Sequence, residues 1–408
     1  MTLFGSFSIE QIWNSECEHS DIIGLANSIT VTRPAVAFLS LFWERVDPVQ
    51  WVDNFYSLVK EIKQISPHTK IELVLDSVYQ PWADLIKLDN IEHVTFIDFF
   101  ALSLWHRVVE LKHCVPCKTW NHSNNNFLFL TGKPDKVNRI RLLYKFYQQQ
   151  LLGRCTWSLF HNNHYKEQCK KLLSELTNKE YNEFVDQHIC NPDSIAIINN
   201  PNGSLHYGGT PFDTTIYQNC TFQVVSETLF ANELNFPVWI TEKTWLAILN
   251  HRPFIIAGES GILKKLKQLG FRTFDQYLLV DDYDNIIDNE RRLDTIVKNT
   301  KHWLNNISNS STQIQQDVDY NFQQFQQLVE QNQKKITERI IAYNIDCDIS
   351  DVVLLIDIHQ HAQWQNWYDR IRDVSWPDCP SEQDFWALPE SVRTECIEVF
   401  GYKPKEKV

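Results

Sequence analysis

Thr241, Glu242 and Lys243 begin a segment whose apolar residues recur at helical spacing as far as Leu249. Thr241 is the predicted N-cap of this helix, and Glu242 and Lys243 fall in its first turn. Backbone N–H groups at a helix start favour an anion, and a lysine beside them adds a point charge that suits phosphate. A carboxylate in the same turn can accept hydrogen bonds from two ribose hydroxyls. The triplet therefore predicts a binding site for a nucleoside diphosphate, in which Lys243 binds phosphate and Glu242 binds the sugar. The alternative is ordinary helix-start chemistry, in which Glu242 only complements the helix dipole.

The elements that position this triplet are two short apolar strands. Residues 222–225 form an apolar run that ends in Ser226-Glu227, and residues 253–257 form a second run closed by Gly258 and Gly261. A second helix is predicted over 261–269, with Gly270 as its C-terminal cap. The pattern over 222–274 is therefore strand, loop, helix, strand, loop, helix.

This order of a strand-end glutamate, a Thr-Glu-Lys helix start and a strand that ends in glycine resembles the nucleotide-sugar half of GT-B glycosyltransferases. It is most similar to the α-1,3-fucosyltransferase-like group, over residues 222–275 and more thinly over 127–160. The resemblance implies that Glu227, Thr241, Glu242 and Lys243 bind the donor. It also implies an inverting reaction that needs no metal and no cofactor besides the nucleotide-sugar donor. Thr228 stands where the family has asparagine, so the sugar specificity stays open.

A basic junction lies earlier in the chain. Residues 127–130 predict a strand, a loop with Lys133 follows, and a helix is predicted over 137–152 with Arg139 and Arg141 in its first turns. In the resemblance, a basic residue at this junction reaches the donor pyrophosphate, and an arginine would grip two phosphate oxygens. The alternative is a solvated basic face on an amphipathic helix. Spacing does not choose between Arg139 and Arg141.

The first part of the chain alternates predicted strands (35–43, 71–75 and 93–100) with predicted helices (48–65 and 81–88), which is typical of a parallel α/β sheet. Ligands of such sheets gather at the carboxyl ends of the strands. Glu44 and Asp76 follow or end two of these strands. We therefore expect Glu44, or failing it Asp76, to act as the general base toward an acceptor hydroxyl.

The predicted fold class is α/β, with two Rossmann-like domains in a GT-B-like arrangement and a C-terminal helical appendix. We expect an acceptor-side domain over 1–118, a polar linker over 118–126 and a nucleotide-sugar domain over 127–310. Residues 311–408 would form a long helix over 312–341, crossing back onto the first domain, and then a tryptophan-rich appendix. Oligomerisation or partner binding is the alternative role of the long helix.

Composition narrows the function classes. The 408 residues carry a net charge of −13, which argues against a broad nucleic-acid footprint. No apolar run predicts a transmembrane helix, and residues 1–10 do not have the pattern of a signal peptide. Ten scattered cysteines, including Cys114-Val-Pro-Cys117, indicate reduced thiols in a cytoplasmic protein, with a zinc or redox site as the lesser alternative. The acidic run 281–284 is interpreted as a surface turn and not as a metal site.

The sequence thus predicts a glycosyltransferase that moves a sugar from a nucleotide-sugar donor to an unidentified hydroxyl acceptor. The first alternative is a non-catalytic scaffold that keeps the same fold and binds a protein partner through its C-terminal tryptophans. An enzyme that glycosylates modified DNA bases is a third possibility, which the acidic charge disfavours.

Overall fold

The computed structural model describes residues 4–8, 19–31, 34, 36–41, 48–86, 90–105, 116–120, 126–131, 137–158, 179, 184, 215–230 and 238–343. Glu44, Lys133, Cys114 and the tryptophan-rich segment after residue 343 lie outside the described residues. All structural statements below concern the described part of the chain.

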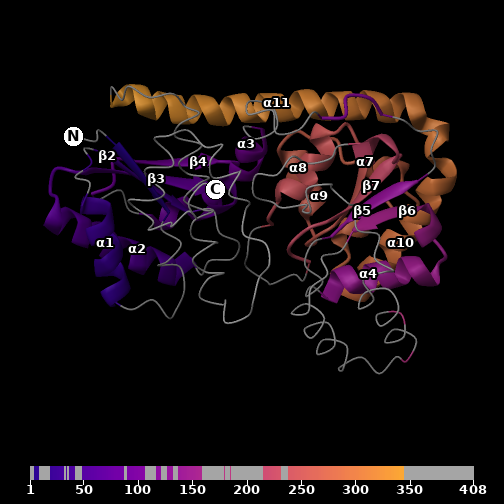
Figure 1. Cartoon of the computed structure of the whole chain (residues 1–408), viewed down its shortest axis with the longest axis horizontal. Helices are drawn as coiled ribbons and strands as arrows, with labels where there is room; N and C mark the ends of the chain where they lie inside the picture. The colour runs from indigo at the N-terminus through magenta and orange to yellow at the C-terminus, as the bar shows by residue number, and fades with distance from the viewer. Residues whose placement is uncertain are drawn as a thin grey trace, which may run out of the picture.

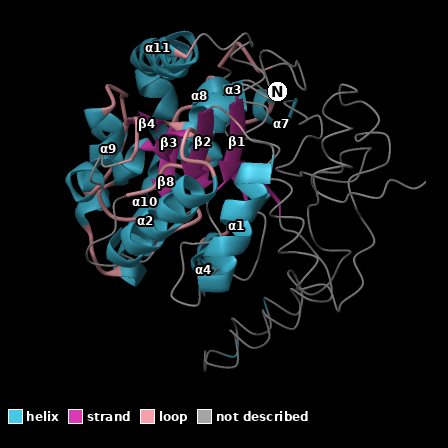
Figure 2. Cartoon of the chain, turned by 90° about the vertical axis from the view of Figure 1, so that its left-hand side faces the viewer, coloured by secondary structure: helices cyan, strands magenta, loops and turns pink. Residues whose placement is uncertain are grey.

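A first sheet contains four parallel strands in the order β1-β2-β3-β4. Its strands are β1 (Phe4–Ser8), β2 (Val36–Leu41), β3 (Lys70–Asp76) and β4 (His93–Ile97), and its helices are α1 (His19–Val31), α2 (Pro48–Ile65), the 3-10 helix η2 (Ser77–Leu85) and α3 (Phe99–Trp105). Figure 2 shows these strands side by side, with α1 and α2 below them and the long helix α11 above. The parallel α/β pattern and the helix over 48–65 are confirmed.

Two boundaries in this sheet differ from the sequence prediction. The strand expected over 93–100 ends at Ile97, because the N–H of Phe99 donates to the Asp76 carboxylate and the N–H of Leu102 donates to the Asp98 carbonyl, which starts α3. Strand β1 was not predicted. Its five residues, Phe-Gly-Ser-Phe-Ser, have little hydrophobicity and are ordered by pairing with β2.

A second sheet contains four parallel strands in the order β6-β5-β7-β8. Its strands are β5 (Phe127–Leu130), β6 (Cys155–Ser158), β7 (Phe222–Ser226) and β8 (Phe254–Ala257). The accompanying helices are α4 (Val137–Gln148), η4 (Leu152–Arg154), α7 (Thr215–Gln218), α8 (Glu242–Leu249), α9 (Ile262–Gln268), η7 (Asp275–Tyr277), η8 (Tyr283–Asn285), α10 (Asn289–Asn306) and η9 (Ile307–Ser310). The strand–helix alternation predicted over 222–274 is confirmed.

Helix α11 (Ser311–Ala342) runs the length of the molecule and passes over both sheets (Figure 1). Near its start, Asp317 accepts hydrogen bonds from Arg272 (2.5 Å) and Tyr277 (2.7 Å) beside the second sheet. Near its end, Arg339 donates to both carboxylate oxygens of Glu72 on β3, at 3.2 and 2.7 Å. Helix α11 therefore forms hydrogen bonds to residues beside the second sheet and to a strand of the first. The long helix predicted over 312–341 is confirmed.

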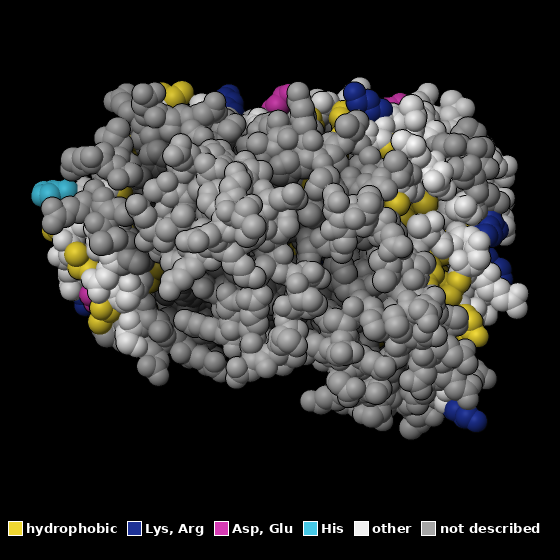
Figure 3. Space-filling view, in the orientation of Figure 1, with side chains coloured by type: hydrophobic (Ala, Val, Ile, Leu, Met, Phe, Trp, Pro, Cys, Tyr) yellow, Lys and Arg dark blue, Asp and Glu magenta, His cyan; other side chains and the backbone are white. Residues whose placement is uncertain are grey.

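The outer side of α11 is mainly polar, with Tyr320 and Ile341 as its exposed large apolar side chains. Described basic and acidic side chains appear along the upper edge of the molecule in Figure 3, where Figure 1 places this helix. Its opposite side buries apolar residues at helical spacing, namely Ile314, Val318, Phe325, Leu328, Val329 and Ile336. None of the helices in the described part combines the length and the apolar character that crossing a bilayer requires.

The two sheets also share their cores. Trp239, from the segment before α8, packs edge-on against Tyr79 and Phe100, with ring centroids 5.6 and 6.0 Å apart. Its side chain belongs to the apolar cluster under the first sheet. In the other direction, Phe99 and Leu102 of α3 join the cluster that contains the second sheet and α11. Each half thus contributes side chains to the core of the other.

Candidate functional site

The start of α8 has the geometry that its sequence predicts. Thr241 is the N-cap, with an extended backbone (φ −101°, ψ 179°), and its hydroxyl accepts a long hydrogen bond (3.5 Å) from the N–H of Lys243. Glu242 and Lys243 occupy the first turn, which follows from the preference of threonine for the N-cap and of acidic residues for the first turn.

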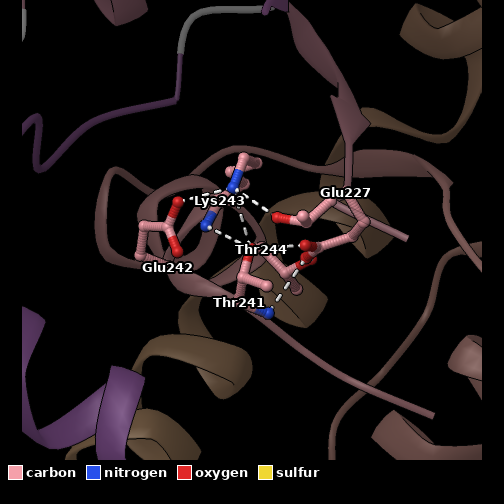
Figure 4. Close-up of polar contacts among 6 residues, drawn as sticks. Glu227, Thr241, Glu242, Lys243 and Thr244 are labelled. Carbon is pink, nitrogen blue, oxygen red and sulfur yellow. Dashed lines mark hydrogen bonds and ion pairs between the residues drawn. The ribbon is translucent and has the colours of Figure 1, made fainter. Parts of the chain in front are cut away.

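Glu227 is buried directly below this helix start, with an exposed fraction of 1%. Its carboxylate accepts hydrogen bonds from the Thr241 N–H (3.3 Å), the Thr241 hydroxyl (2.5 Å) and the Thr244 hydroxyl (2.5 Å), as Figure 4 shows. Burial raises the pKa of Glu227, although the Lys243 ammonium and the two hydroxyls favour its charged form. The Glu227 carboxylate therefore connects the end of β7 to the start of α8 through Thr241 and Thr244, and its expected contact with the donor stays a prediction.

Lys243 is held at the same helix start by three side-chain oxygens. Its ammonium lies 2.6 Å from Glu242 Oε1, 3.1 Å from Thr228 Oγ1 and 3.2 Å from Thr241 Oγ1 (Figure 4). The α-1,3-fucosyltransferase-like group that the sequence resembles has asparagine where this chain has Thr228. The hydroxyl of Thr228 is one of the three acceptors of Lys243. A phosphate that binds Lys243 must therefore share the ammonium with Glu242 or displace its carboxylate.

The structure distinguishes the two arginines of α4. Arg141 forms an ion pair with Glu290 of α10, and Lys145 lies 3.2 Å from Glu290 and 2.5 Å from Asp294. These partners are half-exposed, so Arg141 belongs to a solvated face between α4 and α10. Arg139, by contrast, is 4% exposed in the first turns of the helix that follows β5. Of these two arginines, Arg141 already has a carboxylate partner, and the pyrophosphate role expected for Arg139 or Arg141 stays a prediction.

Asp76 ends β3 and is 8% exposed. Its two oxygens accept hydrogen bonds from the N–H groups of Val78 (3.0 Å) and Phe99 (3.3 Å). Burial raises the pKa of Asp76 to about 7, and the negative charge of Asp98 is the second cause of the rise. The N–H groups of Val78 and Phe99 and the charge of Lys265 act in the opposite direction and lower the pKa. A carboxylate with a pKa near neutral pH can take up a proton during a reaction and release it afterwards.

Asp76 lines a small pocket between the two sheets. Asp98, directly after β4, and Phe100 of α3 line the same side of the pocket. The opposite wall comes from the segment before α8, from α8, and from α9 and the residue after it, namely Val238, Ile240, Trp245, Lys265 and Leu269. The volume of the pocket is about 10 Å³, which is enough for roughly one water molecule. The pocket brings Asp76 next to the helix that carries the Thr-Glu-Lys start, but Arg139, Arg141 and Lys243 are not among its lining residues.

Asp98 and Lys265 are two pocket residues that local sequence patterns do not predict. Asp98 was placed inside a strand expected over 93–100, but the strand ends one residue before it. An acidic residue directly after a buried strand is the signal that had selected Asp76, and with the correct boundary it would have selected Asp98 also. Nothing in the local sequence marks Lys265, which is one of several lysines on α9.

Asp284, from the acidic run 281–284, and Cys117 each have a hydrogen-bond partner in the structure. Asp284 accepts hydrogen bonds from the N–H groups of Leu263 (3.0 Å) and Lys264 (3.4 Å) and so caps α9. The sulfur of Cys117 lies 2.9 Å from a guanidinium nitrogen of the buried Arg252. In the part of the chain that the structure describes, no group of three or more His, Cys, Asp or Glu side chains is arranged to hold a metal ion.

Comparison with known proteins adds no candidate relative, because no protein-family model, no curated protein and no solved structure matches this chain.

Proposed function

We propose that this protein is a nucleotide-sugar-dependent glycosyltransferase with a GT-B-like arrangement of two Rossmann-like halves. The observation that carries the proposal is the pocket between the sheets. Asp76, at the carboxyl end of β3, faces residues that flank the Thr-Glu-Lys start of α8. Ligands of parallel α/β sheets bind at such strand ends, and a helix start beside them suits a diphosphate.

The reaction assigns a separate role to each half. Asp76 takes the proton of the acceptor hydroxyl, whose oxygen then bonds to the anomeric carbon of the donor sugar. The bond from that carbon to the diphosphate breaks, and the nucleoside diphosphate leaves with the electron pair. Lys243, Arg139 and the N–H groups of α8 stabilise the negative charge that grows on the leaving group. Glu44, outside the described residues, is the other candidate for the base.

The proposal requires the two halves to move apart. A ligand site for a molecule of this size has a volume of roughly 300–1,000 Å³, whereas the pocket holds about 10 Å³. Donor binding must therefore widen the space between β3 and α8. The donor phosphate must also share the Lys243 ammonium with Glu242, or displace the Glu242 carboxylate, which is then free for ribose.

Thermal stabilisation by nucleoside diphosphates, with GDP and UDP first, is the direct test, because a ligand that binds only the folded state raises its stability. We expect Lys243→Ala to weaken binding by roughly 10- to 100-fold, which corresponds to the loss of a charged hydrogen bond. Lys264→Ala is the matched control, since it removes an exposed lysine of α9. Equal affinity in both variants would refute the role of Lys243.

Turnover is tested next with the sugar nucleotide whose base gives the shift. Hydrolysis of the donor without acceptor is sufficient as a first assay. Asp76→Asn should keep nucleotide binding and lower turnover by roughly 10²- to 10⁴-fold, the usual contribution of a general base. Unchanged turnover would transfer the role to another residue, with Glu44 as the first to substitute.

Two observations favour a second candidate, a non-catalytic binding module. The pocket holds about one water molecule, and the Lys243 ammonium already has a carboxylate partner 2.6 Å away. On this reading the Thr-Glu-Lys start only caps α8. The absence of any thermal shift with the nucleotide panel would favour the module over the enzyme.

A further inference from the structure

The pocket contains a second carboxylate, Asp98, whose surroundings differ from those of Asp76. Strands β3 and β4 are adjacent and parallel, with Asp76 paired to Ile97. Asp98 is therefore the next residue beyond the edge at which Asp76 lies. Both side chains line the same pocket.

The hydrogen-bond donors to the two carboxylates are of different kinds. Asp76 accepts only from backbone N–H groups in the described part of the chain, at Val78 and Phe99. Asp98 accepts from two side chains: the Ser77 hydroxyl donates to Oδ1, and the Asn332 amide lies 3.5 Å from Oδ2. The hydroxyl and the amide can both donate to an ionised carboxylate at Asp98.

Asn332 connects the pocket to α11. It is fully buried, with an exposed fraction of 0%, on the helix that is fastened to both sheets. Lys335, three residues further along that helix, donates to the Phe96 carbonyl at 2.8 Å. From the opposite wall, Lys265 of α9 is the charged residue that lines the pocket. The charged groups that face Asp76 from the packed elements are therefore Asp98 and Lys265, with Lys335 at the edge of β4.

The negative charge of one carboxylate in a pocket disfavours ionisation of its neighbour, so the neighbour binds a proton more readily. Asp98 is the more exposed of the two and has two side-chain donors, while Asp76 is almost completely buried. Burial first, and then the negative charge of Asp98, raise the pKa of Asp76, so Asp76 takes up a proton more readily than an ordinary aspartate does.

We propose that Asp98 is a positioning residue: its negative charge, held by Ser77 and Asn332, keeps Asp76 a strong enough base to accept a proton near neutral pH. This inference rests on the proposed role of Asp76 as the base of a glycosyl transfer. It adds to that role a second source of the basicity besides burial, and it makes α11 part of the site through Asn332.

The test follows the Asp76 carboxyl carbon by NMR as the pH is varied, with Asp76→Asn used to identify its signal. In the unmodified protein the midpoint should lie near pH 7. Asp98→Asn removes the neighbouring charge but keeps the shape of the side chain, and it should lower this midpoint by about one pH unit. Asp281→Asn, at an exposed aspartate away from the pocket, should leave it unchanged. An Asp76 midpoint that is the same with and without Asp98 would overturn the inference.

Ser77→Ala provides an independent variant if Asp98→Asn does not fold. The Ser77 hydroxyl stabilises the negative charge of Asp98, so its removal should weaken the effect of that charge on Asp76 and lower the Asp76 midpoint by a smaller amount. No change in Ser77→Ala would contradict the inference as well.

An activity measurement separates this inference from the proposed function. If the protein turns over a nucleotide sugar, the acidic limb of the kcat/KM profile should move to lower pH in Asp98→Asn. If no nucleotide sugar is bound or turned over, the proposed function fails, and the NMR titration still decides whether Asp98 controls the protonation of Asp76.

Discussion

The burial of Asp76 makes a quantitative prediction about stability that needs no substrate. The pKa of Asp76 is about 7 in the folded protein, against 3.8 for the ordinary side chain. Between these two values the folded protein binds a proton that the unfolded chain has released, so stability falls as the pH rises. One pKa unit corresponds to about 1.4 kcal/mol, so the complete effect is about 4 kcal/mol. It is absent below pH 3.8 and complete above about pH 7.

Asp76→Asn removes this dependence, because asparagine does not titrate. The variant has its own constant penalty, since its amide group faces the N–H of Phe99 where a carboxylate oxygen had accepted a hydrogen bond. That penalty does not change with pH. The free energy of unfolding of the variant, minus that of the unmodified protein, should therefore increase by roughly 3 kcal/mol between pH 5 and pH 8.

Urea unfolding of both proteins at a series of pH values measures this difference, provided that the m-values agree. Glu227 and Asp284 also have raised pKa values, but they are present in both proteins and their contributions cancel. Asp281→Asn, which changes an exposed aspartate, serves as the control with a constant difference. If the curves for Asp76→Asn and the unmodified protein run parallel from pH 5 to pH 8, the reasoning about Asp76 is wrong.

Three further substitutions test the contacts that assemble the site. Thr244→Val removes one hydroxyl donor from the buried Glu227, and we expect the free energy of unfolding, measured in urea, to fall by about 1–3 kcal/mol. Arg339→Ala leaves Glu72, which is 0% exposed, without its guanidinium partner; a loss of about 3–5 kcal/mol is expected, together with faster hydrogen exchange in β3. Trp239→Ala empties the space between the halves and should lower stability by about 3–5 kcal/mol in the same assay. A change below 0.5 kcal/mol in any of the three would contradict the role given to that side chain.

Local patterns in the sequence were sufficient for most of the elements near the site. The apolar runs at 71–75 and 253–257 predicted buried strands, and the structure has β3 and β8 there. Helical spacing predicted α2 and the long α11. The position of Thr241 before Glu242 and Lys243 predicted an N-cap, which the structure confirms. These features depend on residues within a few positions of one another, so short-range preferences are enough to predict them.

The sequence failed where a side chain is assigned by a distant partner. Arg139 and Arg141 are two positions apart, yet one is buried and the other pairs with Glu290, which is 149 residues away in the chain. The predicted end of β4 was wrong because the N–H of Phe99, at the start of α3, donates to the carboxylate of Asp76, 23 residues earlier in the chain.

The basicity of Asp76 illustrates what only the tertiary structure decided. The sequence alone placed an aspartate at the end of a strand, which left its charge and its neighbours open. The strand order puts Asp98 beside it, α11 adds Asn332, and the second sheet closes the pocket with Lys265. Burial and electrostatic interactions depend on distance in space and not on separation along the chain, so the protonation state of Asp76 is fixed only when both halves and the long helix are assembled.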